Sequence, residues 1–228
     1  MKPITLPSAA GILFFLVASV SGQTLDSNTC IECHLAQDAP ISTPAEVYEA
    51  DVHTLAGLGC EVCHGGDPAE FDMEFSMDPT VGYIGVPEGQ QIVEMCGQCH
   101  SDPEYMRRYN PNLITDQVDK YWTSGHGMAL RAGNGDVATC VSCHSVHQIK
   151  RVGEPASAVY HANVAQTCGV CHSNAEMMAR NGLTAVPVSQ YMGSVHGIAL
   201  LERGDTAAPT CNNCHGNHGA IPPELSSI

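Results

Sequence analysis

The chain is poor in aromatic and basic residues. Aromatic residues make up 5% of the 228 positions, with a single tryptophan, and 9 Lys and Arg face 24 Asp and Glu, giving a net charge of −15. Such an acidic chain repels nucleic acid and anionic lipid, so we expect neither as a partner. A cationic docking partner and plain solubility are two open explanations for the charge. The shortage of aromatic residues also predicts a thin protein core for this length.

A long apolar run is missing as well. The longest one extends from Ala9 to Val20 and falls short of the roughly 20 residues that cross a bilayer, so we expect no stable membrane insertion. The run follows Lys2 and is succeeded by small residues up to Gly22, which is typical of a secretory signal peptide. We predict a signal peptide over residues 1–22 and export to the periplasm or the cell exterior. A retained membrane anchor is the alternative.

Cysteine, in contrast, is abundant, and all twelve cysteines lie in six CxxCH motifs. The thiols of such a motif add to the two vinyl groups of a haem, and the histidine binds the iron. Disulfide frameworks, zinc ribbons and thioredoxin-like sites explain paired cysteines but leave the histidine unexplained. We therefore predict six covalently bound haem c groups. Their motifs are Cys30, Cys33 and His34; Cys60, Cys63 and His64; Cys96, Cys99 and His100; Cys140, Cys143 and His144; Cys168, Cys171 and His172; and Cys211, Cys214 and His215.

Six histidines lie outside the motifs, as many as there are predicted haems. These spare histidines are His53, His126, His147, His161, His196 and His218. We predict that they fill the second axial positions and give bis-histidine haems of low potential, although a surface histidine is the alternative at each position. His147 and His218 each follow a motif histidine by three residues. So short a segment does not reach round its own haem, so each must serve a neighbouring one.

The chain repeats itself in three dihaem units, predicted at residues 23–92, 93–155 and 156–228. The second and third units share the segments CGxCHSxxExMxR, YxxSxHGxAL and TCxxCHxxH. The first unit has Asp67 where the others have His147 and His218. Either axial ligands cross the unit boundaries, or one early haem, such as that of Cys60 to His64, lacks an internal sixth ligand.

Secondary structure is weakly encoded, because glycine (22) and proline (14) are frequent and apolar periodicity is faint. We predict a mostly irregular chain with short α-helices and little or no β-sheet, in which the haems form much of the core. The clearest predicted helices begin at motifs, over Cys96–Arg108 and Cys168–Asn181. Gly65–Gly89 is acidic and has no motif; we interpret it as a solvated loop, with a calcium site or a cationic partner as alternatives.

Tyrosines recur five residues before three of the spare histidines, and we predict that they pack against the haems. They are Tyr48, Tyr121 and Tyr191.

The YxxSxHG and CxxCHxxH segments at residues 121–147 and 191–218 resemble those of multihaem cytochromes c from anaerobic respiratory bacteria and archaea. That class includes periplasmic electron carriers and extracellular cytochromes that polymerise into filaments. The resemblance implies electron transfer through stacked bis-histidine haems and, in the filament branch, a histidine passed between subunits of a homopolymer. Expected partners are redox proteins or membrane quinol-oxidising complexes.

A haem enzyme is the alternative function, namely a reductase of a small nitrogen or sulfur oxyanion. It would need one open haem beside a proton donor or anion-binding group. No CxxCK motif is present. A closed set of axial histidines leaves no iron open to substrate, so we expect an electron carrier and not an enzyme.

Overall fold

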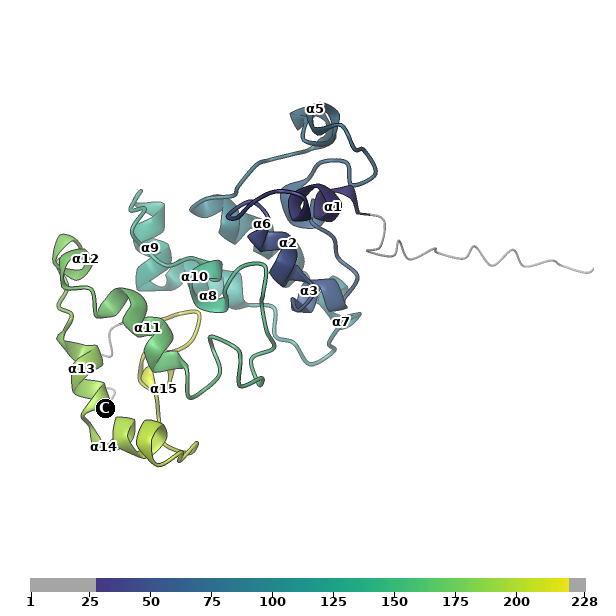
Figure 1. The fold of residues 1–228 in the computed structure, drawn as a ribbon. Helices are drawn as coiled ribbons and strands as arrows, with labels where there is room; N and C mark the ends of the chain where they lie inside the picture. Colours follow the sequence, from purple (N-terminus) through teal and green to yellow (C-terminus); the bar gives the residue numbers. More distant parts are fainter. Residues whose placement is uncertain (1–27, 222–228) are drawn as a thin grey trace, which may run out of the picture.

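The computed structural model describes residues 28–221 as short helices joined by irregular segments, with no strand in that range (Figure 1). The predicted fold class is therefore confirmed. The predicted signal peptide lies outside the described residues. Over residues 28–221, no helix has the length and apolar character that crossing a membrane requires.

The helices are three to eleven residues long. They are α1 (Thr29–Leu35), α2 (Thr43–Tyr48), α3 (Val52–Leu55), α4 (Glu61–His64), α5 (Met73–Ser76), the 3-10 helix η2 (Pro79–Val81), α6 (Gln90–His100), α7 (Pro103–Arg107), α8 (Gln117–Thr123), α9 (Gly125–Arg131), α10 (Cys140–His144), α11 (Val164–His172), α12 (Ala175–Arg180), α13 (Val186–Met192), α14 (Val195–Gly197), the π-helix η3 (Ile198–Glu202) and α15 (Cys211–His215).

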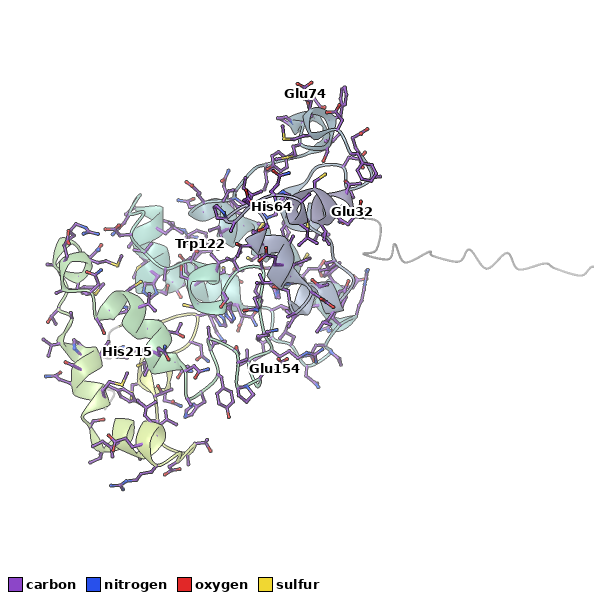
Figure 2. All side chains as sticks on the ribbon, viewed as in Figure 1. Glu32, His64, Glu74, Trp122, Glu154 and His215 are labelled. Atoms are coloured by element: carbon purple, nitrogen blue, oxygen red, sulfur yellow. The ribbon has the colours of Figure 1, made fainter. Side chains whose placement is uncertain are left out.

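The three units follow one another in space as they do in sequence. In Figure 1, α1 to α5 lie on one side of the molecule, α8 to α10 in the middle, and α11 to α15 on the other side. Figure 2 places His64 and His215 in these two outer parts, with Trp122 between them. Motifs at the two ends of the chain are therefore well separated.

The first motif of the second and third units closes a helix, so the predicted start of these helices at the motif is wrong. Helix α6 ends at His100 and α11 ends at His172. The next helix begins after a turn, where Asp102 accepts a hydrogen bond from Glu104 N at 2.8 Å and Asn174 accepts one from Met177 N at 3.0 Å. These side chains cap a new helix, which is why the predicted continuous helices are broken.

The second motif of each unit is held by the recurring tyrosine. Each tyrosine hydroxyl donates to the carbonyl two residues before the first cysteine of that motif. The bonds are Tyr48 to Leu58 O at 2.9 Å, Tyr121 to Ala138 O at 2.8 Å and Tyr191 to Pro209 O at 3.1 Å. The tyrosines therefore fasten the motif to the helix that precedes a spare histidine, a role that the sequence did not predict.

An equivalent backbone hydrogen bond joins neighbouring units at each of the two junctions. Val52 N donates to Ile149 O at 2.9 Å between the first and second units, and Gly125 N donates to Ala220 O at 2.9 Å between the second and third. Each donor precedes a spare histidine, and each acceptor lies two residues after His147 or His218. The two junctions are therefore equivalent.

Protein side chains alone form a small core. Between residues 28 and 221, ten apolar residues are buried, and the one cluster consists of Val93, Tyr121 and Leu130 with partly buried neighbours. Two of the apolar residues inside the motifs are exposed, Val62 by 44% and Val170 by 76%. Apolar side chains gathered at the motifs suit the face of a haem, as expected for a haem-cored chain.

The acidic loop of the first unit shows no sign of the calcium site considered above. Asp67, Asp72 and Asp78 each accept a hydrogen bond from the backbone N–H two residues further on, which uses them as local turn caps. Across residues 28–221, no three His, Cys, Asp or Glu residues come close enough to hold a metal ion. Helix α5 with Glu74 projects at the edge of the molecule (Figure 2).

Candidate haem-binding site

All twelve cysteines are free thiols in this structure. Inside each unit, the first cysteines of the two motifs lie side by side. A hydrogen bond with Cys60 lowers the pKa of Cys30 to about 7, and one with Cys168 lowers the pKa of Cys211 to about 6. Cys96 lowers the pKa of Cys140 in the same way. The two motifs of each unit are therefore direct neighbours.

Second cysteines approach one another across the unit boundaries. Burial raises the pKa of Cys63, and Cys99 of the next unit contributes to the rise. Burial likewise raises the pKa of Cys143, with a contribution from Cys171. Together with the contacts inside the units, these approaches arrange all six motifs in sequence order.

Eight of the twelve histidines face one another in four pairs, each made of one motif histidine and one spare histidine. The ring centroids are 5.9 Å apart for His64 and His147, 6.1 Å for His100 and His53, 6.0 Å for His144 and His218, and 6.0 Å for His172 and His126.

The spacing of these pairs fits one iron between two imidazoles. A metal–imidazole bond is about 2.0 Å long and the ring centroid lies about 1.1 Å behind the nitrogen, so two opposed axial ligands have centroids about 6 Å apart. Each pair therefore fits a haem held covalently by the motif, with the spare histidine as its second axial ligand. Such a haem would supply one-electron chemistry.

Six of the eight paired imidazoles have a lowered pKa, which favours the neutral state that binds iron. Burial is the largest cause that lowers the pKa of the affected histidines, and a neighbouring imidazole lowers it further in most cases. This applies to His100, His126, His144, His147, His172 and His218.

Every pair joins two different units, and the pairing follows one rule. The first motif histidine of a unit faces a spare histidine in the middle of the preceding unit, as His172 faces His126. The second motif histidine faces the spare histidine at the end of the following unit, as His144 faces His218. His64 faces His147. The early site without a partner is therefore that of His34, not that of His64.

Four histidines belong to none of the imidazole pairs within residues 28–221. His34 and His215 donate Nδ1–H to Ile41 O at 3.1 Å and to Ile221 O at 3.0 Å, which leaves Nε2 free for iron. His161 uses Nε2 to donate to Ala208 O at 2.9 Å, beside the last motif. His196 is exposed on α14.

One residue beside a paired histidine escaped the sequence analysis. Asp51 is 1% exposed, and its Oδ1 lies 2.9 Å from Nδ1 of His53. Burial alone would raise the pKa of Asp51, but hydrogen bonds from His53 and Ile149 outweigh it and hold the pKa below its usual value. The signal was present in the repeat, because Asp51 replaces Ser124 and Ser194 of the later units.

Three comparisons with known proteins bear on this arrangement. The family model described as cytochrome c3 matches residues 52–173, more than half of the chain. The C-type polyheme cytochrome OmcB of Geobacter sulfurreducens is 29% identical over 126 residues, which cover 54% of this chain and 14% of OmcB. The multiheme cytochrome MtrA of Shewanella baltica is 25% identical over 203 residues, which cover 86% of this chain and 47% of MtrA. No solved structure matches.

The chain therefore spans less than half the length of these curated relatives. Its matched segment runs from the junction residue Val52 to the end of the fifth motif and contains all three spare histidines of the first two units together with His161. The resemblance to multihaem cytochromes of anaerobic respiration is confirmed, and covalent haem c is the cofactor. This chain belongs to the cytochrome c3 family of multihaem c-type cytochromes.

Proposed function

We propose that the chain carries six haems, one at each CxxCH motif, and passes electrons along them in sequence order. The observation that carries this proposal is the set of four imidazole pairs at 5.9 to 6.1 Å, each of which would close both axial positions of one iron. A closed iron exchanges electrons but does not bind substrate. Contacts between successive motif cysteines support haems close enough for direct transfer.

A haem count and a ligand-binding spectrum together test this proposal. The intact mass of the purified holoprotein should exceed that of the processed chain by six haems, and carbon monoxide should leave most of the reduced spectrum unchanged. A smaller count would overturn the six-haem proposal. A carbon monoxide complex at several haems, together with turnover of nitrite or another small oxyanion, would favour the reductase instead.

The cellular setting follows from the sequence. We propose export to the periplasm or the cell exterior and exchange of electrons with redox proteins or membrane quinol-oxidising complexes that present cationic surfaces. The net charge of −15 supports such docking. Reduction by a cationic partner should slow markedly between low and physiological salt, whereas a salt-independent rate would contradict charge-guided docking.

Under the pairing rule, His34 and His196 have no partner within residues 28–221, and this supports a homopolymer. His196 takes the place in the third unit that His53 and His126 take in the first two, and Val195 before it is 79% exposed. Val52 and Gly125, at the equivalent positions, donate their N–H to a neighbouring unit. We propose that His196 of one copy binds the haem of His34 in a second copy.

Size measurements with matched variants test the homopolymer. The wild-type holoprotein should form assemblies at high concentration, and His196→Ala should remain monomeric and leave one haem per chain high-spin. Gln190→Ala, on the neighbouring helix α13, is the control and should assemble normally. Assembly of His196→Ala with unchanged haem spectra would refute this ligand exchange.

A further inference from the structure

The first unit carries a buried carboxylate where the other two units have a serine. Asp51, Ser124 and Ser194 each lie two residues before a spare histidine and cap the helix that contains it. Ser124 donates to Tyr121 O at 2.6 Å and accepts from Gly127 N at 3.0 Å. Both of these contacts involve the backbone, so the serine hydroxyl is occupied away from the histidine ring.

Asp51 instead contacts the imidazole itself. Its Oδ1 accepts hydrogen bonds from His53 N at 2.8 Å and from His53 Nδ1 at 2.9 Å, and its Oδ2 accepts one from Ile149 N at 2.6 Å. These three donors satisfy a carboxylate that is 1% exposed. Two of these bonds hold Oδ1 against His53, and Ile149 of the next unit binds the other oxygen.

This contact sets His53 apart from the other histidines. Within residues 28–221, His53 is the one histidine with a ring nitrogen within 4 Å of a carboxylate. The motif histidines His34, His64 and His215 use Nδ1 to donate to neutral backbone carbonyls. A carboxylate on Nδ1–H makes the opposite ring nitrogen a stronger electron donor than a carbonyl does. Stronger donation stabilises ferric over ferrous iron.

We propose that Asp51 gives the haem of Cys96 to His100 the lowest reduction potential in the chain. His53 faces His100 at a centroid distance of 6.1 Å, so the effect of Asp51 would reach that iron through His53. An electron would then cross this haem without remaining on it. The haem would separate the two haems of the first unit from the three haems that follow it. The inference rests on the proposed ligation of this haem by His53.

The test replaces the charge and keeps the shape. Asp51→Asn has the same shape but no charge and only one acceptor oxygen, so it removes the carboxylate from His53. In an optical redox titration of the six-haem protein, one haem should move to a higher potential, and the other five should keep their midpoints. The number of high-spin haems, measured by electron paramagnetic resonance, should be the same as in the wild-type protein. Unchanged potentials, or an equal shift of all six, would overturn the proposal.

Two matched variants separate this role from structural effects. Ile149→Pro removes the N–H that binds Oδ2 but leaves the contact with His53, so it should leave every midpoint in place; a shift equal to that of Asp51→Asn would show that Asp51 acts by joining the units. His53→Ala should turn one haem high-spin. If His53→Ala has no more high-spin haem than the wild-type protein, the proposed ligation fails. If His53→Ala gives one additional high-spin haem but Asp51→Asn changes no midpoint potential, the ligation stands and only the proposed role of Asp51 fails.

Discussion

The first unit and the two that follow preserve the same scaffold but differ in the groups that face their neighbours. All three retain the tyrosine that binds the segment before the second motif and a left-handed residue after that motif. The first unit departs at Asp51 and Asp67 and inserts an acidic loop after His64. The shared features hold a motif in place, whereas Asp51 contacts the next unit through Ile149.

The comparison distinguishes two tasks of a unit that are not apparent from the sequence repeat. A unit must position its own CxxCH motifs, and under the proposed ligation it would also lend imidazoles to adjacent units. His53 and His126 perform the second task at equivalent junctions, each following a residue whose N–H binds the next unit. The absence of a histidine at Asp67 therefore concerns what the first unit lends, not whether its own motifs are intact.

The largest effect is expected when a spare histidine that faces a motif of another unit is removed. His126→Ala removes the partner of His172, so one haem should become high-spin and bind carbon monoxide when reduced. His196→Ala, at the equivalent position of the third unit, should not change the spectrum of a dilute monomer. Electron paramagnetic resonance of both variants checks this. Equal losses in the two variants would mean that His196 has a partner inside its own chain.

A smaller but still large effect is expected at the glycine after these histidines. A Cβ at Gly127 would lie 2.0 Å from Tyr121 O, so Gly127→Ala should cost about 2–4 kcal/mol of unfolding free energy. The first unit has Thr54 at this position, and Thr54→Gly should cost only about 1 kcal/mol. Chemical denaturation followed by far-ultraviolet circular dichroism measures both. Similar costs would show that the two turns are packed alike.

The tyrosines test what the units have in common. Tyr48→Phe and Tyr121→Phe each remove one hydrogen bond to a backbone carbonyl, so each should lower the unfolding free energy by about 1 kcal/mol. Tyr105→Phe is the control, because its hydroxyl faces Tyr109 at the surface, and it should change stability little. A clear difference between Tyr48→Phe and Tyr121→Phe would contradict the equivalence of the first two units.

The smallest effect is expected just after the second motif. Ser145 has φ 72° and ψ 177°, a conformation that suits glycine, and Gly65 and Gly216 occupy the equivalent positions. Ser145→Gly should therefore raise the unfolding free energy by about 1 kcal/mol. Gly216→Ser, where a Cβ has no neighbour closer than 3.7 Å, should lower it by a similar amount. Stabilisation by Gly216→Ser would contradict this account.

The sequence predicts the lack of strands across residues 28–221, because glycine and proline interrupt long elements. It misplaces helices α6 and α11 because the caps Asp102 and Asn174 were overlooked, although Ser-Asp-Pro-Glu after His100 is a recognisable helix start. Which spare histidine faces which motif was not predictable, since the partners lie between 46 and 83 residues apart and nothing local distinguishes them.

The middle unit gives two imidazoles and takes two. His126 and His147 go to its neighbours, while His53 and His218 come from them. This exchange is balanced, so a duplicate of residues 93–155 inserted beside the original would find every donor and acceptor already supplied. Genes for such proteins can lengthen by tandem duplication without inventing a new metal site. The length of the haem array would thus depend on the number of copies of the middle unit.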